Sequence, residues 1–290
     1  MDSRGYSIGQ QRIPMRQIWI NNGFMAISHL SNIIPRCDRK AQVYCVGLPR
    51  SGTHTLAEIL GCGLKSSHEP LKKLTISFIV NEHVRRNDEQ VMQWLRLRDA
   101  CLRLEVEASH FMHYFANHLA RLFPLSRFIL TIREPLSWLE SEINVNHSAG
   151  RSVYWRNLEE YRYGISSVFN EDFDRDWQLR DDRIEKCLSY WVRHIETVID
   201  GVPPERLMIV NTSDISSEMA NICRFVGLDD SCINCNARGG LRARSVVRIC
   251  GATRVRVIDH IKKLCLPMIH ARLPFLLRDM GYIAGSTSGY

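Results

Sequence analysis

The feature that most constrains this chain is a strand, a glycine loop and a helix that follow one another near the N-terminal end. Residues 43–46, Val-Tyr-Cys-Val, are apolar and rich in β-branched side chains, which indicates a buried parallel strand. Gly47 and Gly52 bracket a tight turn, and the helix predicted from Thr53 onward is apolar on one face. Glycines permit close approach, and loop amides beside a helix N-terminus attract anions. The stretch therefore predicts an α/β fold with a site for a phosphate-like group.

The loop differs from the phosphate loop of nucleoside triphosphatases. Gly47 and Gly52 have the G-x-x-x-x-G spacing, but Thr53-His54 replaces the Lys-Ser/Thr pair of that loop. No acidic residue at the end of a predicted strand clearly supplies a magnesium ligand. We therefore expect a phosphate-like ligand bound without a metal. The alternative is an ordinary strand-to-helix turn with no ligand.

Length and charge restrict the class of protein. A chain of 290 residues accommodates one α/β domain, which we expect over residues 41–290, with an N-terminal extension over 1–40 and a helical insert near 150–180. The composition, 45% hydrophobic and 24% charged, is ordinary for a soluble globular protein. The net charge of +7 favours an anionic ligand but is too small to indicate nucleic acid as a partner.

The sequence predicts a cytoplasmic protein without a membrane partner. No run approaches the roughly 18 apolar residues of a transmembrane helix, and the first residues lack the pattern of a signal peptide. Ten cysteines in such a chain are expected to be free thiols. Cys232 and Cys235 form a lone C-x-x-C without a second pair at zinc-finger spacing, so we expect no metal site.

A second candidate anion site follows a later strand. Residues 127–132 are predicted to form a strand that ends at Arg133, and Pro135 stands in the first turn of the next helix. Ser141 lies two turns into that helix, so Arg133 and Ser141 are able to converge on one anion. The alternative is a surface arginine and an unrelated helix serine.

Three candidate bases are expected near the carboxyl ends of the strands, where open α/β sheets bind ligands. His68 and Glu69 lie on a predicted loop that leaves the first strand–helix unit. His110 follows a second predicted strand, residues 102–106, and precedes a helix. A histidine with an ordinary pKa suits proton transfer at neutral pH. A buried structural histidine remains the alternative for His110, and a surface turn for His68 and Glu69.

Both anion motifs resemble those of the sulfotransferases that use 3′-phosphoadenosine-5′-phosphosulfate (PAPS). Residues 49–53, Pro-Arg-Ser-Gly-Thr, resemble the 5′-phosphosulfate loop of that family. Residues 133–141, with Arg-x-Pro and a serine eight positions after the arginine, resemble its 3′-phosphate motif. The motifs occur in the family's order. The resemblance covers residues 41 to about 145 well and continues more weakly to about 245.

The resemblance implies a three-layer α/β fold with a mostly parallel sheet, PAPS as co-substrate, and transfer of a sulfuryl group to an acceptor hydroxyl. The acceptor would be a small molecule, a natural product or a carbohydrate. It implies the following roles: 5′-phosphosulfate binding by Arg50, Ser51, Gly52, Thr53, His54 and Thr55; 3′-phosphate binding by Arg133 and Ser141, with help from Arg238; and catalysis by His110, with His68 or Glu69 as alternative bases and Arg50 offsetting charge.

The sequence departs from the cytosolic members of that family in two places, and two other functions remain open. Arg50 replaces a lysine, and Thr55 stands where a tryptophan often stacks on adenine, so the residue that contacts adenine is not assigned. One alternative function is a P-loop-type kinase for nucleotides or small molecules. The other is a protein that binds PAP, the nucleotide product, without catalysis.

The remaining periodic segments predict helices and one further strand. An amphipathic helix is expected over residues 82–98, a helix after His110 through residue 122, and a long helix over 184–198. A strand is expected over 207–211, followed by a helix that ends at Gly227. The tail predicts a helix that is interrupted near Pro267.

Overall fold

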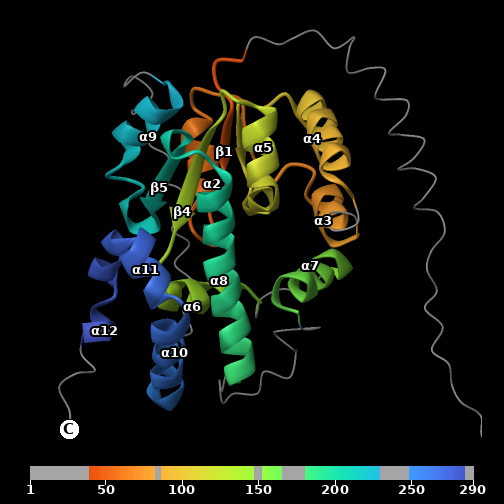
Figure 1. The fold of residues 1–290 in the computed structure, drawn as a ribbon. Coiled ribbons are helices and arrows are strands. Elements are labelled where there is room, and N and C mark those ends of the chain that lie inside the picture. The colour runs from red at the N-terminus through yellow and green to blue at the C-terminus, as the bar shows by residue number, and fades with distance from the viewer. Residues whose placement is uncertain (1–38, 82–85, 147–151, 165–179, 229–247, 285–290) are drawn as a thin grey trace, which may run out of the picture.

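A computed structural model describes residues 39–81, 86–146, 152–164, 180–228 and 248–284. Its centre is a five-stranded sheet in the order β2-β3-β1-β4-β5, and every pair of neighbouring strands is parallel (Figure 1). The strands are β1 (Val43–Cys45), β2 (Ser66–His68), β3 (Val106–Ala108), β4 (Arg127–Ile132) and β5 (Leu207–Asn211). This architecture confirms the predicted α/β fold class.

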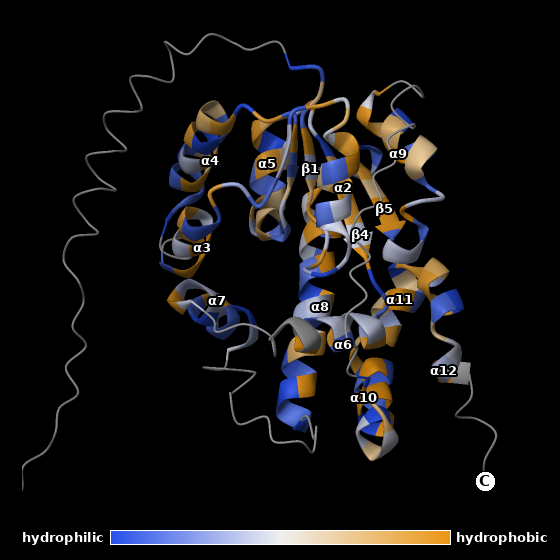
Figure 2. Ribbon diagram, turned by 180° about the vertical axis from the view of Figure 1, so that it is seen from behind, coloured by the Kyte–Doolittle hydropathy of each residue, from blue (hydrophilic) through white to orange (hydrophobic). Residues whose placement is uncertain are grey.

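Alternating side chains bury both faces of the sheet, as expected for parallel strands covered on two sides. Val43 and Cys45 of β1 belong to a cluster that includes Leu56, while Tyr44 and Phe128 belong to a cluster on the opposite face. The helices α5 (Ala116–Leu122) and α8 (Asp181–Gly201) lie in front of the sheet in Figure 1, and α2 (Thr53–Leu60) lies behind it. The reversed view in Figure 2 brings α2 to the front. The molecule thus has three layers.

The first half of the chain adds helices around these layers. They are α3 (Lys72–Asn81), α4 (Asp88–Leu102), the 3₁₀ helix η1 (His110–Phe115), α6 (Pro135–Asn146) and α7 (Val153–Tyr163). Helix α7 packs on α3 and α8, beyond the carboxyl ends of the strands. Of the helical insert predicted near 150–180, the structure describes residues 152–164, which contain α7. Residues 165–179 of that segment lie outside the described residues.

The second half closes the domain around α8 and α6. Its elements are η2 (Pro204–Arg206), η3 (Thr212–Asp214), α9 (Met219–Val226), α10 (Gly251–Leu264), α11 (Leu266–Arg272), η5 (Pro274–Asp279) and α12 (Gly281–Ala284). Helix α10 packs against α8 and α6. Pro267 stands in the first turn of α11, so the predicted break of the tail helix is confirmed.

Three sequence-based boundaries are wrong for local reasons. The helix predicted over 82–98 is α4, and it begins at Asp88 because Asn87 and Gln90 form a capping box. It continues to Leu102 and ends where Arg103 adopts a left-handed φ of 48°, so the strand predicted over 102–106 is instead Val106–Ala108. The predicted loop around His68 contains a short edge strand, β2, whose polar side chains hide its periodicity.

Free cysteines were expected, and one cysteine departs from that expectation. Cys45, Cys101, Cys187, Cys223, Cys250 and Cys265 are free thiols. Cys62 is disulfide-bonded, which corrects the expectation for that residue. Among the described residues, no helix combines the length and the apolar character that crossing a bilayer demands.

Candidate active site

The glycine loop, residues 47–52, has the geometry of an anion cradle. The loop bends back on itself, because Ser51 Oγ donates to the Leu48 carbonyl at 2.6 Å and lies 2.8 Å from Thr131 Oγ1 on β4. Gly52 takes a left-handed φ of 96° and precedes α2, whose N-terminus carries no side-chain cap among the described residues. A Cβ on Gly47 would collide with the Thr131 hydroxyl, so only glycine fits there. The first amides of α2 are therefore left for a ligand.

Side chains from three separate elements brace this loop from outside. Trp138 Nε1 on α6 donates to the Pro49 carbonyl at 3.0 Å, and Thr212 Oγ1 on η3 donates to the Ser51 carbonyl at 2.8 Å. His194 Nε2 on α8 donates to the Val46 carbonyl at 2.8 Å. Two of these carbonyls belong to the loop, and the third, that of Val46, directly precedes it. The loop is therefore rigid before any ligand arrives, which is the preorganisation that anion binding requires.

Glu69 and His110 form the contact at the centre of the site. Parallel pairing of His68 with Ala108 brings the ends of β2 and β3 together, and the Glu69 amide donates to the Ala108 carbonyl at 3.0 Å. Glu69 itself has a φ of 48°. His110 Nδ1 then lies 3.0 Å from Glu69 Oε1, and both side chains are largely shielded from solvent. Two residues that the sequence proposed as alternatives are thus partners.

The pKa values of Glu69 and His110 decide which of the two side chains carries a proton at neutral pH. Burial by itself raises the pKa of Glu69, but His110, His68 and Lys72 outweigh burial and lower that pKa to about 2. Burial and the nearby Arg162 cation lower the pKa of His110 to about 4, against the opposing effect of Glu69. At neutral pH the carboxyl is ionised and the imidazole is neutral. The contact is then a hydrogen bond from Nδ1–H to a carboxylate, which leaves Nε2 as a proton acceptor.

His68 connects this pair to the glycine loop. Its Nε2 lies 3.4 Å from the Thr53 hydroxyl, in the first turn of α2, and 3.9 Å from Glu69 Oε1. Burial is the main cause of a lowered pKa for His68. The imidazole of His54 packs edge-on against that of His68 at 5.0 Å, although His54 is exposed. The structure therefore brings all three candidate bases to one edge of the sheet, beside the loop.

The second predicted anion site is assembled only in part. Arg133 directly follows β4, and the Trp191 indole on α8 donates to its carbonyl at 3.0 Å. Its guanidinium Nε donates to Ser137 Oγ at 3.0 Å. In the described residues no hydrogen bond joins Arg133 to Ser141, which lies one helical turn beyond Ser137 on α6. Arg238 lies outside the described residues, as do Cys232 and Cys235.

Two further residues of the predicted 5′-phosphosulfate loop are Arg50 and Thr55. Arg50 is exposed and has a left-handed φ of 65° in the turn of the loop. Thr55 is half-buried in the first turn of α2. Both belong to the segment that surrounds the N-terminus of α2.

Sequence reasoning missed three buried groups behind His110. His113 Nδ1 lies 2.5 Å from the His110 carbonyl, and the imidazoles of His113 and His194 stack at 3.7 Å. Arg162 on α7 is buried and is a main electrostatic neighbour of His110. Arg162 had no visible signal, because it lies in a segment rich in exposed-looking charged residues.

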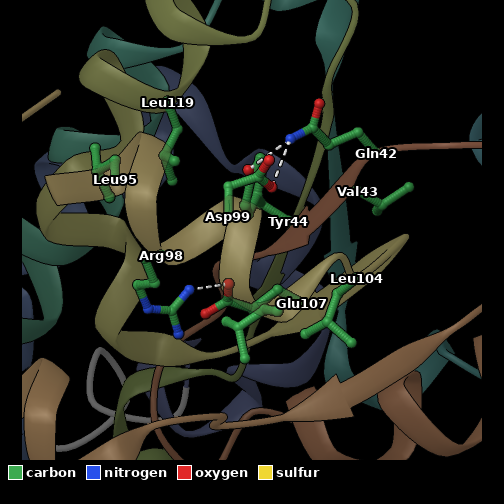
Figure 3. A pocket seen from close by; sticks show the side chains of 10 residues that line it. Gln42, Val43, Tyr44, Leu95, Arg98, Asp99, Leu104, Glu107 and Leu119 are labelled. Carbon is green, nitrogen blue, oxygen red and sulfur yellow. Dashed lines mark hydrogen bonds and ion pairs between the residues drawn. The ribbon is translucent and has the colours of Figure 1, made fainter. Parts of the chain in front are cut away.

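A small pocket lies elsewhere, between α4, α5 and the strands β1 and β3 (Figure 3). Within it Arg98 and Glu107 form a buried ion pair, drawn as a dashed line in the figure. Burial is the main cause of a raised pKa for Glu107. Arg98 Nη2 also donates to the Pro70 carbonyl at 3.0 Å. Arg98 therefore anchors the turn that immediately follows Glu69, while the pocket itself is no part of the candidate site.

Metal chemistry finds no support in this region. Within the described ranges, no group of three or more His, Cys, Asp and Glu side chains is arranged to hold a metal ion. His68, Glu69 and His110 instead contact one another, Thr53 and Lys72.

Several solved structures are similar to this chain. One is a sulfotransferase from Alicyclobacillus acidocaldarius, at 16% identity and a TM-score of 0.39, covering 65% of this chain and 81% of that one. Another is the sulfotransferase domain of the Synechococcus PCC 7002 olefin synthase, at 15% identity and a TM-score of 0.41, covering 79% and 97%. A third is the sulfotransferase domain of the curacin biosynthetic pathway, at 13% identity and a TM-score of 0.37, covering 74% and 82%.

Sequence families give a clearer assignment. No curated protein matches the chain. The model of the family described as "Sulfotransferase domain" matches residues 42–231. That match begins just before β1 and includes the glycine loop, the three candidate bases and Arg133. Because it extends over more than half of the chain, this protein belongs to the sulfotransferase domain family.

Proposed function

We propose that this protein transfers the sulfuryl group of PAPS to the hydroxyl group of an acceptor. The hydroxyl oxygen forms a bond to sulfur, the bond from sulfur to the 5′-phosphate oxygen breaks, and PAP leaves with that electron pair. The observation that carries the proposal is the Glu69–His110 pair, with 3.0 Å between Oε1 and Nδ1, at the sheet edge that also holds the glycine loop. A proton acceptor beside an anion cradle is what such a transfer needs.

The glycine loop fits a 5′-phosphosulfate. The uncapped N-terminus of α2 and the turn around Gly52 supply amide donors, and the missing side chain of Gly47 lets the loop pack closely on Thr131 of β4. Arg50 in the turn would offset negative charge on the bridging oxygen as its bond to sulfur breaks. A sulfuryl group carries less negative charge than a phosphoryl group, so the residues do not need a metal to neutralise it.

Arg133 is the candidate for the 3′-phosphate. Its guanidinium is held by Ser137 through Nε, which leaves other donors of the fork for a second anion. Burial is the main cause of a lowered pKa for Arg133, but an arginine stays charged at neutral pH. Ser141 would add a hydroxyl donor if the ligand reaches one turn further along α6. Arg238 remains a sequence-based candidate for the same phosphate.

His110 is the first choice for the base. Its pKa of about 4 makes it a weaker base than the histidine of ordinary pKa that the sequence suggested, but a stronger one than Glu69. Glu69 accepts the Nδ1 proton and so fixes both the tautomer and the orientation of the ring, which presents Nε2 to the acceptor. The hydroxyl proton then passes to His110 Nε2 as the oxygen attacks sulfur. His68 is the second choice, since its Nε2 lies 3.4 Å from the Thr53 hydroxyl beside the loop. Direct proton transfer to Glu69 is the third choice, although a carboxylate with a pKa of about 2 is a weak base.

The two alternative functions are less well supported by the same residues. A P-loop-type kinase needs a lysine on the β- and γ-phosphates, and Thr53-His54 occupies those positions. A protein that binds PAP without catalysis has no use for a neutral histidine oriented by a buried carboxylate. That pair favours an enzyme.

The test is transfer of radioactive sulfur from labelled PAPS to hydroxyl compounds of a cell extract. Wild-type protein should form labelled products, and His110→Ala should lose about 10²–10⁴-fold in kcat while PAP affinity changes little. His110→Asn should do no better, because it keeps a similar polar shape without basicity. The exposed His270 gives a matched control as His270→Ala. A folded His110→Ala protein with normal turnover would reassign the base to His68 or Glu69, and melting curves establish folding.

A further inference from the structure

Arg162 on α7 is a buried cation with two side-chain nitrogens that lack hydrogen-bond partners among the described residues. Its side chain is buried, with a relative exposure of 4% for the residue, and no described carboxylate forms an ion pair with it. Its Nε and Nη2 atoms have no hydrogen-bond partner in the described part of the chain. These two atoms lie on the same edge of the guanidinium, the edge that binds a carboxylate through two parallel hydrogen bonds. Against the effect of burial, Tyr190, Tyr114, Tyr163 and Glu142 raise the pKa of Arg162, so it stays charged. None of these groups bonds to the Nε/Nη2 edge, and a buried, charged edge without a hydrogen bond indicates a place for an anionic ligand group.

A second buried group without a partner lies close by. His110 Nε2, the proposed proton acceptor, is also buried and unpartnered in the described residues. Phe111 lies close to both groups: its ring centroid is 4.0 Å from that of His110 and 6.0 Å from the Arg162 guanidinium carbon. The fork and the base thus lie on one aromatic surface, at the contact between α7 and η1.

Trp155 on α7 extends that surface toward solvent. Its ring is stacked on the His110 imidazole at 6.3 Å, with 20° between the planes, and lies 5.9 Å from Phe111. Trp155 is half-buried, whereas His110, Phe111 and Arg162 are buried. Trp155 is thus the partly exposed member of an aromatic surface whose other members are buried.

The unpartnered atoms define what that acceptor should carry. We propose that the acceptor is a hydroxycarboxylate with an aromatic body, whose carboxylate binds the Nε/Nη2 edge of Arg162 and whose hydroxyl donates to His110 Nε2. Its ring packs on Phe111 and Trp155. The proposal rests on the proposed sulfuryl transfer, because it uses the same base. A neutral carbohydrate would leave the Arg162 fork without an anion and would place hydroxyl groups against the aromatic surface.

The proposal is tested by calorimetric titration of the complex with PAP, in which no turnover interferes. The probe is 3-(4-hydroxyphenyl)propanoate, and its methyl ester is the uncharged control with the same ring and hydroxyl. The acid should bind the wild-type complex at least tenfold more tightly than the ester. Arg162→Gln should remove this preference without changing the affinity for PAP. Arg156→Gln, an exposed position on the same helix, should retain it.

A third variant covers the case in which Arg162→Gln does not fold. Arg162→Lys keeps the charge but lacks the fork, so the preference for the acid should fall at least threefold with the melting temperature nearly unchanged. Equal binding of acid and ester to the wild-type complex, no saturable binding of the acid, or a preference that survives both substitutions would overturn the proposal. Failure of PAP itself to bind would instead count against the proposed sulfuryl transfer.

Discussion

His110 Nδ1 lies 3.0 Å from Glu69 Oε1, and this contact joins the ends of two neighbouring parallel strands. The carboxylate is held in turn by Lys72, whose Nζ lies 3.5 Å from Oε2, and by the backbone pairing of Glu69 with Ala108. His110 is therefore oriented from the side opposite to its free nitrogen. The ring presents Nε2 in one tautomer without any ligand.

Removing the charge of Glu69 should impair catalysis and spare nucleotide binding. Glu69→Gln keeps the size of the side chain, but its amide no longer stabilises the Nδ1–H tautomer of His110 or the imidazolium that forms. We expect a loss on the order of 10²-fold in kcat, with the affinity for PAP unchanged. Steady-state kinetics and PAP titration measure both. Glu58→Gln on the exposed side of α2 is the control; if it lowers kcat equally, Glu69 has no special role.

The buried histidines should make stability depend steeply on acidity. Burial lowers the pKa of His110 to about 4 and that of His194 to about 3, and it also lowers that of His113. The unfolded chain therefore takes up protons near pH 6.5, before the folded protein does. Stability is constant above that pH and decreases as pH falls from 6.5 toward 4, by up to about 1.4 kcal/mol per pH unit for each histidine.

Urea unfolding at pH 7.5 and pH 5.0 measures this effect. Glu69 does not interfere, because its lowered pKa costs stability only as pH falls from about 4.5 toward 2. His194→Gln should reduce the difference between the two pH values, and His270→Gln should leave it unchanged. An unfolding free energy that is equal at both pH values would show that these histidines are protonated in the folded protein.

Arg133 should distinguish the two ends of the nucleotide. Arg133→Ala should weaken PAP by about 1.5–3 kcal/mol, roughly ten- to a hundred-fold. Adenosine-5′-phosphosulfate, which lacks the 3′-phosphate, should be affected little. Calorimetric titration measures the affinity of the variant for both ligands. Arg121→Ala, at an exposed position on α5, is the control and should change neither affinity. Equal weakening of the two ligands would place Arg133 at another part of the nucleotide or in a purely structural role.

Gly47 should tolerate no side chain. A Cβ at this position would meet the hydroxyl and the carbonyl of Thr131, both fixed by β4, and the Ser51 hydroxyl. Gly47→Ala should therefore cost about 1–3 kcal/mol of stability and weaken PAP, because the loop must shift. Gly281→Ala, where nothing lies within 4 Å, is the matched control. Urea unfolding and PAP titration that show no change for Gly47→Ala would contradict the described loop.

The parts of the fold that sequence predicted well have strong periodicity. β1, α2, β4 and α8 combine apolar patterns with clear start or stop residues, such as Gly52 before α2 and Pro135 after β4. The short edge strand β2 was missed because its three residues, Ser-Ser-His, are polar and only half-buried. Its existence depends on pairing with β3, which no local pattern reveals.

The candidate site was predicted as a set of residues but not as an arrangement. The sequence placed His110 at a strand end, and His68 and Glu69 on a loop beside the glycine-loop unit, so all three were expected near the edge where parallel strands end. The sequence had no means to show that Glu69 contacts His110, because β2 was not recognised and its neighbour was unknown. Arg162 was missed for a different reason: its burial comes from α7 packing on α3 and α8, and an arginine in a charged segment normally indicates solvent exposure.

The most direct test of the central claim is calorimetric titration of the wild-type protein with PAP, with ADP and with ATP plus Mg²⁺. If the glycine loop holds a 5′-phosphosulfate and Arg133 holds a 3′-phosphate, as proposed, the preferred nucleotide carries a 3′-phosphate. PAP should bind saturably, ADP should bind at least tenfold more weakly, and Mg²⁺ should not improve the binding of ATP. Binding of ATP with Mg²⁺ that equals or exceeds that of PAP would contradict the account and favour the kinase alternative.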